Sequence, residues 1–371
     1  MAQGTEWVGL DAARVTALVA ADRNGGDRVG RLPIVMGLDQ HRAQITAEWI
    51  DLETGEISRG RVVPADRAAV RKFLGRFAGR RLEVAMEATT GWRFVAEELE
   101  RVDAGVHLAE PAETSGLRGP KKRPKTDWAD ARHLRELLLI GRLPESWIPP
   151  EHILDLRATV RCRHTLSHQR TEWQQRIQSV LYHHGCPQRR NLMSVEGREW
   201  LEGQPLPQAA REQVTIAVAM IGALDVQLDP LTTRLCDYAR RQTGCKALIA
   251  SYYGIGGLCA VTILAELGDT RRFQNARDVV RYGGLDITVK QSDQHRAPGH
   301  RSRQGPPALR WALYEAAQRA RHPGSPDREY YLQTAERIGG NRACLALARK
   351  LLKRSYHTLR DLGDDALTPG A

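Results

Sequence analysis

Four acidic residues stand where they could do chemistry. Asp39 and Glu87 each close an apolar run, and Asp127 and Asp130 lie three apart at an expected helix start. Residues three apart share a helix face, and clustered carboxylates suit a hard cation such as Mg²⁺. Acids in a first turn also complement the helix dipole, so that interpretation stays open for Asp127 and Asp130. If the four acids gather, they predict a site for one or two Mg²⁺ ions acting on phosphoryl groups.

A run of cations comes just before Asp127. Its members are Arg118, Lys121, Lys122, Arg123 and Lys125. Two prolines within it favour an extended backbone. A solvated loop is one interpretation. Beside a carboxylate cluster, however, cations can hold the phosphate backbone of a nucleic acid, and we expect that contact here.

The elements that must position the acids form an α/β pattern over residues 31–150. Strands are expected at 32–39, 45–50, 82–87 and 106–108, with another beginning at Arg61 after a turn over 51–56. Helical spacing covers 65–77 and 92–99, and Thr126 is the expected N-cap of a third helix. This order predicts a mixed sheet covered by helices, with Asp39 and Glu87 at strand ends.

Residues 151–245 predict a helical arm. One helix is expected over 153–182 and a second over 209–241, where apolar residues alternate steps of three and four. The two helices predict an antiparallel coiled coil that serves structure and self-association. Pro230 lies inside the second helix and predicts a kink or a break.

Residues 246–371 predict a mostly helical domain. Helices are expected over 258–267, 273–282, 307–321 and 342–359. Gly254-Ile255-Gly256 before the first helix suits a helix-hairpin-helix contact with a phosphate backbone, although a plain tight turn is the alternative. A polar loop is expected over 286–304. It contains Ser292, Arg296, Arg301 and Arg303. Ser292 has no adjacent base, so an unactivated loop serine is one interpretation, and activation by a metal is the other.

The composition fits a globular protein with a polyanionic partner. The chain has 371 residues, enough for two or three domains, and a net charge of +11. Six scattered cysteines without paired spacing disfavour a zinc site or a disulfide framework. No long apolar run predicts a membrane span. Residues 1–30 lack a secretory pattern and predict a loosely ordered extension.

Short stretches along the chain, from about residue 35 to its C-terminus, resemble the DEDD transposases of the insertion-sequence-110 family, the bridge-RNA-guided recombinases. The ordered stretches are Gly37-Leu38-Asp39, Met86-Glu87-Ala88-Thr89-Thr90-Gly91, Lys125-Thr126-Asp127-Trp128-Ala129-Asp130-Ala131, Gly254-Ile255-Gly256, Ala265-Glu266-Leu267-Gly268-Asp269, Arg272-Phe273, Tyr282-Gly283-Gly284-Leu285 and Leu309-Arg310. In this chain Asp293 follows Ser292 where the family usually has glycine.

The resemblance implies an α/β plus all-α protein. It implies a RuvC-like, RNase H-type domain over 31–150, the arm over 151–245 and a transposase domain over 246–371. The implied Mg²⁺ ligands are Asp39, Glu87, Asp127 and Asp130, and the implied nucleophile is Ser292. The implied partners are donor and target DNA, an element-encoded guide RNA and further copies in a homodimer or homotetramer. The implied location is the prokaryotic cytoplasm, at the nucleoid and not in a membrane.

Two other functions stay open. A metal-dependent nuclease, similar to a Holliday-junction resolvase, would use water as its nucleophile. A catalytically inactive derivative would only bind nucleic acid. We favour the recombinase, because it is the function that the family resemblance implies.

Overall fold

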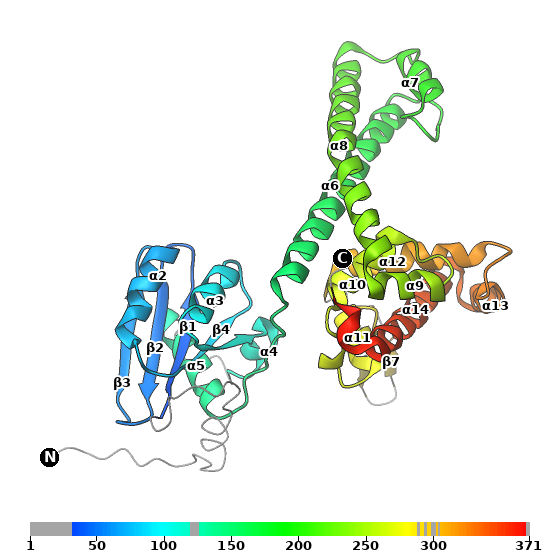
Figure 1. The fold of residues 1–371 in the computed structure, drawn as a ribbon. Helices are drawn as coiled ribbons and strands as arrows, with labels where there is room; N and C mark the ends of the chain where they lie inside the picture. The colour runs from blue at the N-terminus through cyan, green and yellow to red at the C-terminus, as the bar shows by residue number, and fades with distance from the viewer. Residues whose placement is uncertain are drawn as a thin grey trace. The chain divides into compact units, whose positions relative to one another are not determined.

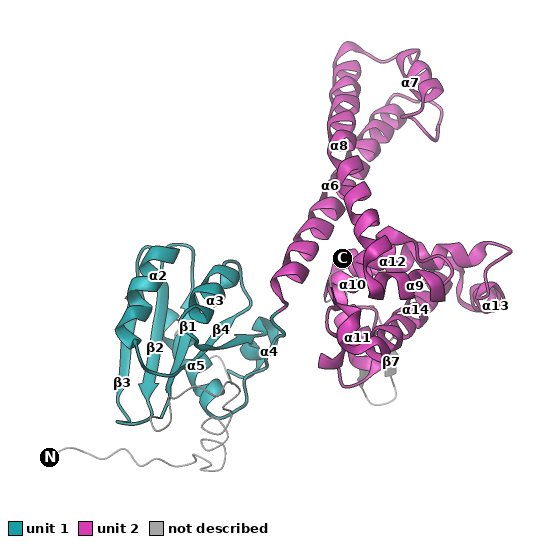
Figure 2. Cartoon of the chain, in the orientation of Figure 1, with its two compact units in different colours: residues 1–148 teal, residues 149–371 magenta. Residues whose placement is uncertain are grey.

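The computed structural model describes residues 32–118, 126–287, 290–292, 295–297, 302 and 305–368. The predicted extension over 1–30 lies outside them. So do Lys121, Lys122, Arg123, Lys125, Arg301 and Arg303. The chain divides into two compact units, residues 1–148 and 149–371 (Figure 2).

The first unit is built on a five-stranded mixed sheet, which confirms that prediction. Its strands are β1 Ile34–Gln40, β2 Ile45–Asp51, β3 Ile57–Val62, β4 Leu82–Glu87 and β5 Gly105–Ala109, in the order β3-β2-β1-β4-β5. The pairs β1–β2 and β2–β3 are antiparallel, whereas β1–β4 and β4–β5 are parallel. The expectation that the third strand begins at Arg61 is wrong, because pairing with β2 already starts at Ile57.

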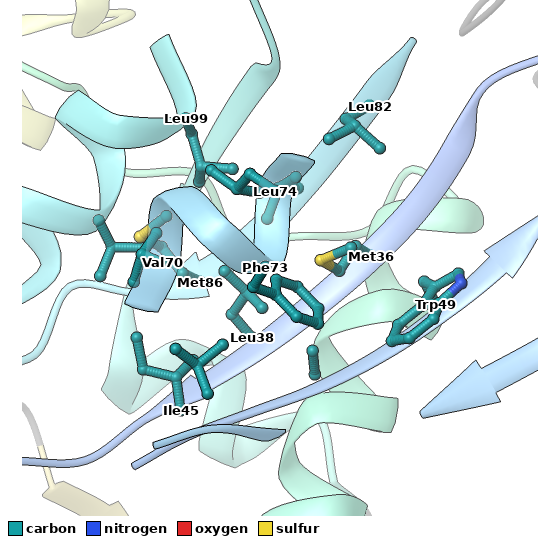
Figure 3. Packing of buried hydrophobic residues seen from close by; sticks show 14 of the residues in the cluster. Met36, Leu38, Ile45, Trp49, Val70, Phe73, Leu74, Leu82, Met86 and Leu99 are labelled. Carbon is teal, nitrogen blue, oxygen red and sulfur yellow. The ribbon is translucent and has the colours of Figure 1, made fainter. Parts of the chain in front are cut away.

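Helices cover both faces of this sheet. They are α2 Arg67–Leu74, α3 Trp92–Glu100, α4 Pro111–Gly116 and α5 Asp127–Leu139. On one face, α2 and α3 pack over Met36, Trp49 and Met86 (Figure 3). The other face lies under α5, where Leu134 and Leu138 join a smaller apolar cluster. Alternation along the strands therefore sends Met36 and Leu38 to the first face, and Gly37 and Asp39 to the α5 face.

The second unit begins with two long helices, as predicted. They are α6 Glu151–His183 and α8 Gln208–Arg241, with α7 Val195–Glu202 between them (Figure 1). The two helices pack side by side, and α8 buries Val214, Ile221, Leu228 and Leu235 at seven-residue intervals. Of the kink or break predicted at Pro230, the break is absent, since α8 continues through this residue.

Among the described helices, α8 alone is long and apolar enough to cross a membrane by length and composition. A core helix of a soluble protein passes the same test, and α8 packs its apolar seam on α6. This feature is therefore weak support for a membrane span.

The remaining helices form a bundle with α10 and α14 at its centre. They are α9 Thr243–Ser251, α10 Gly257–Leu267, α11 Ala276–Tyr282, α12 Pro307–Gln318, α13 Arg328–Ile338 and α14 Gly340–Leu362. Helix α13 was not predicted. The loop predicted over 286–304 is wrong in part, because strands β6 Lys290–Ser292 and β7 His295–Ala297 pair within it.

Candidate metal centre and nucleophile

Strand register brings Asp39 and Glu87 to the same edge of the sheet. In the parallel pair β1–β4, Leu38 lies opposite Met86, so the two acids are the next residues on neighbouring strands. Alternation turns both toward the α5 face. The sheet therefore places two carboxylates together at the carboxyl ends of parallel strands, where ligand sites of such sheets form.

Helix α5 approaches β1 closely because residue 37 is glycine. A Cβ atom on Gly37 would lie 2.0 Å from the carbonyl oxygen of Ala131, so any side chain would push the helix away. Thr126 is the N-cap of α5, as predicted, and its hydroxyl accepts a 3.2 Å hydrogen bond from the Ala129 N–H. This packing carries Asp127 and Asp130 to the strand ends.

Asp39 and Asp127 share a histidine that the sequence interpretation did not identify. Nε2 of His41 lies 3.2 Å from Oδ2 of Asp39 and 3.7 Å from Oδ1 of Asp127. One ligand atom from each of these three residues falls within 4.8 Å of the others. The Gln44 amide donates a 2.9 Å hydrogen bond to Oδ2 of Asp127. His41 directly follows the end of β1 and lies two residues after Asp39, and this closeness in sequence was the available signal.

The environment of Asp39 disfavours its negative charge. Burial is the main cause that raises the pKa of Asp39 above its ordinary value. His41 acts in the opposite direction, and the neighbouring carboxylates of Asp130 and Asp127 raise the pKa further. Three acids of the predicted set are thus within electrostatic reach of one another.

Arg118 joins the fourth acid to the cluster. Its guanidinium donates a hydrogen bond to Oδ1 of Asp130 and lies 3.5 Å from Oε1 of Glu87. The sequence interpretation placed Arg118 in a nucleic-acid contact. In the structure it is half-buried and pairs with these two carboxylates.

The cluster fits a divalent metal ion. Carboxylate oxygens are the donors that Mg²⁺ prefers. Crowding of Asp39 by Asp127 and Asp130 is a repulsion that a bound cation would relieve. The Arg118 guanidinium already bridges Glu87 and Asp130 as a cation. The cluster therefore favours positive charge at two neighbouring places. One is beside Asp39, and the other is between Glu87 and Asp130, where Arg118 lies.

Ser292 is the last residue of β6, and its backbone pairs with His295 of β7. Arg296 lies in β7, opposite Gln291. Their side chains lie outside the described part of the chain. Nearby, the Ser302 hydroxyl donates a hydrogen bond to Oδ1 of Asp286. A second serine of this segment therefore has a defined structural partner.

The Gly254-Ile255-Gly256 turn has a steric requirement at its first position. Gly254 has φ +88°, and a Cβ atom there would lie 2.5 Å from the carbonyl oxygen of Ala316. Gly256 is the N-cap of α10, and an added Cβ would meet nothing within 4 Å. Packing against α12 therefore explains Gly254, whereas Gly256 stays open to a phosphate contact or to none.

Two family models match separate parts of the chain. A transposase model of the DEDD type of IS110 elements matches residues 36–185. The model for the transposase IS116/IS110/IS902 family matches residues 246–332. The first match includes all four acids of the cluster, and the second includes Ser292.

Curated proteins from two bacteria are similar to this chain. A putative transposase of Sinorhizobium fredii is 28% identical over 233 residues, covering 57% of this chain and 58% of that protein. A second putative transposase of the same organism is 26% identical over 212 residues, covering 56% and 50%. An uncharacterized 43.6 kDa protein of insertion element IS110 from Streptomyces coelicolor is 26% identical over 166 residues, covering 41% of each. The matches thus span about half the length of these relatives.

Proposed function

We propose that this chain, which belongs to the IS110 family of transposases, cuts and exchanges DNA strands when an insertion element moves. The observation that carries the proposal is the gathering of acids from two strand ends and one helix start, within the region matched by the DEDD transposase model. Such a set suits metal-assisted phosphoryl transfer.

The proposed metal ligands are Asp39, Glu87, Asp127 and Asp130, for one or two Mg²⁺ ions. A bound Mg²⁺ would polarise the scissile phosphate and stabilise the charge that develops on its oxygens. His41 would keep the Asp39 carboxylate oriented through its 3.2 Å contact. Arg118 would leave Glu87 and Asp130 when the ligands take up the ion, or stay and neutralise the phosphate.

The proposed nucleophile is Ser292. Its Oγ attacks the phosphorus atom of a DNA phosphodiester and forms the new O–P bond of a phosphoserine. The bond from phosphorus to the 3′ oxygen breaks, and the serine proton passes, overall, to that oxygen, which leaves as a 3′-hydroxyl. Reversal of this step with another 3′-hydroxyl would join the exchanged strands.

The remaining assignments extend the proposal. The first unit would be a RuvC-like domain of the RNase H type, and α6 with α8 would form a coiled-coil arm for self-association, supported by the seven-residue spacing of buried residues in α8. The part after the arm would be the transposase domain. Gly256 and Arg296, with Lys121, Lys122, Arg123 and Lys125 of the basic run, would contact nucleic acid, whereas Gly254 is explained by packing and Arg118 by its pairing with Asp130 and Glu87. The partners would be donor and target DNA, a guide RNA and other copies of the chain, in the prokaryotic cytoplasm.

The serine assignment has a matched control in the same segment. We expect Ser292→Ala to abolish recombination and the covalent protein–DNA adduct on denaturing gels, while RNA binding persists. Ser302→Ala should retain the adduct, because Ser302 already serves as a hydrogen-bond donor to Asp286. An adduct formed by Ser292→Ala would refute the assignment.

A metal-dependent nuclease that uses water is the second candidate. One observation favours this candidate. The first unit alone supplies the carboxylate cluster, and a nuclease that uses water would need no serine from the second unit. This candidate predicts Mg²⁺-dependent strand scission without an adduct, and unchanged scission in Ser292→Ala. The same gels therefore distinguish the two functions.

A further inference from the structure

An arginine and tryptophan strip lies on the first unit beside the carboxylate cluster. We define the strip as Arg59 and Arg61 of β3 with Trp128 and Arg132 of α5. The guanidinium carbons of Arg59 and Arg61 lie 5.6 Å and 5.0 Å from the centroid of the Trp128 ring. Trp128 directly follows Asp127, so the strip begins one residue from a proposed metal ligand.

The fold fixes this strip from two directions. β3 is an edge strand, and its alternating exposure turns Arg59 and Arg61 to the same face. Glu48 lies opposite Arg59 in the β2–β3 register and is fully buried. Oε2 of Glu48 lies 2.7 Å from Nε of Arg59, and Oε1 of Glu48 lies 3.2 Å from Nε of Arg132. One buried acid thus anchors two arginines whose side chains are each 46% exposed.

The strip carries uncompensated positive charge. Glu48 also pairs with buried Arg135, which in turn lies 3.5 Å from the exposed Glu136, so two carboxylates face three guanidiniums. Among the described residues, no acidic group pairs with Arg61, which is exposed and contacts the Trp128 ring. Exposed arginines presented at fixed points are suited to phosphate oxygens, to which they donate in pairs.

From this arrangement we propose that the strip holds the phosphate backbone of the DNA strand that enters the carboxylate cluster. Arg61 and Arg132 contact phosphates, and Trp128 is a positioning residue that keeps the two β3 guanidiniums extended. The inference rests on the proposed function for the identity of the strand. A phosphate backbone is the proposed occupant of the strip because its charge is opposite to that of the arginines. The strip also lies beside the site proposed to act on phosphodiesters.

The test compares two double variants of the full chain. Arg61→Gln with Arg132→Gln removes two charges from the strip, and Glu48 keeps Arg59 and Arg135 as partners. The control, Lys72→Gln with Arg76→Gln, removes two exposed charges from the opposite face of the sheet. Arg76 is itself placed over aromatic rings, 5.6 Å from Trp49 and 5.5 Å from Phe73. The control therefore removes the same number of charges as the strip variant, and it also includes an arginine that lies over aromatic rings.

Fluorescence anisotropy would measure binding of a labelled single-stranded DNA in EDTA, over a range of salt concentrations. We expect the strip variant to bind about three- to ten-fold more weakly, with a salt slope lower by about 0.7 for each lost contact. The control should stay within about two-fold of the parent chain. Trp128→Ala should weaken binding less than the double variant.

Three outcomes would overturn the proposal. The first is a strip variant that binds DNA as the control does. The second is a loss confined to an RNA of the same sequence. The third is an unfolding midpoint that falls while the salt slope stays unchanged, since the strip would then only fasten β3 to α5. Because EDTA removes the metal ion, this binding test does not depend on catalysis. A parent chain that fails to cut DNA would refute the proposed function without contradicting DNA binding by the strip.

Discussion

Two acidic centres under α5 share one face of the sheet and differ in how their charge is compensated. Glu48 has no exposed side-chain surface and pairs with Arg59, Arg132 and Arg135. Asp39 lies on the neighbouring strand, crowded by other carboxylates, with His41 as its near partner. The difference teaches that burial alone does not identify a reactive acid. The fold pairs Glu48 with arginines, whereas Asp39 lies among carboxylates whose repulsion the proposed metal ion would relieve.

Removing the Glu48 charge should give the largest effect on stability. Glu48→Gln leaves three guanidiniums around a neutral amide, and we expect a loss of about 3–5 kcal/mol in the free energy of unfolding. Asp39→Asn is the matched variant, and it should cost less than about 1 kcal/mol because it relieves repulsion. Urea titration followed by circular dichroism would measure both. Equal losses would contradict the distinction between the two centres.

A side chain at Gly37 should disturb both centres at once. Gly37→Ala places a methyl group 2.0 Å from the Ala131 carbonyl oxygen and displaces α5. We expect a loss of about 1–3 kcal/mol in the free energy of unfolding. We also expect weaker Mn²⁺ binding, measured by titration calorimetry at a temperature where the variant is folded. Unchanged stability and affinity would mean that α5 does not need this close approach.

A third acid on the α5 face, Glu83, allows a pH test. Burial lowers the pKa of His107, but hydrogen bonds to Glu145 and Glu83 outweigh it and raise the pKa to about 9. Because the folded pKa is the higher one, the charged pair stabilises fully below about pH 6.5 and is lost as pH rises through about 9. We expect the charged His107 to contribute about 1–2 kcal/mol to the free energy of unfolding. Solvent screening keeps this contribution small, because Glu145 is exposed.

His107→Gln should remove this dependence. Its free energy of unfolding should approach that of the parent chain at high pH and fall below it at neutral pH, as measured by urea titration across the range. Parallel curves for the two proteins would contradict the role of His107.

The sequence predicted the acids of the centre better than their partners. Apolar strands that end in Asp39 and Glu87 are local patterns, and so is the N-cap at Thr126. The pairing of Glu48 with Arg132 joins residues 84 apart, and no local pattern contains it. Arg118 belonged to a basic run in sequence, yet it pairs with acids of β4 and α5. Tertiary packing decides such contacts.

Several elements were not predicted from the sequence because their own residues carry only a weak pattern. Helix α13 buries only Tyr331 and Thr334, so its apolar periodicity is weak. Strands β6 and β7 have three residues each, which is too short for an alternation pattern. β3 begins at an exposed residue, Ile57, and alternates exposed arginines with small residues. Its pairing with β2 defines it more clearly than its own sequence.

Mn²⁺ binding to the full chain, measured by calorimetry beside the Asp39→Asn and Glu48→Gln variants, tests the central claim most directly. The carboxylate centre predicts that the parent chain binds the ion and that Asp39→Asn lowers its affinity at least about ten-fold. Glu48→Gln, measured where it is folded, should bind more nearly as the parent does. Equal affinity of Asp39→Asn and the parent chain would contradict a metal centre at Asp39, Glu87, Asp127 and Asp130.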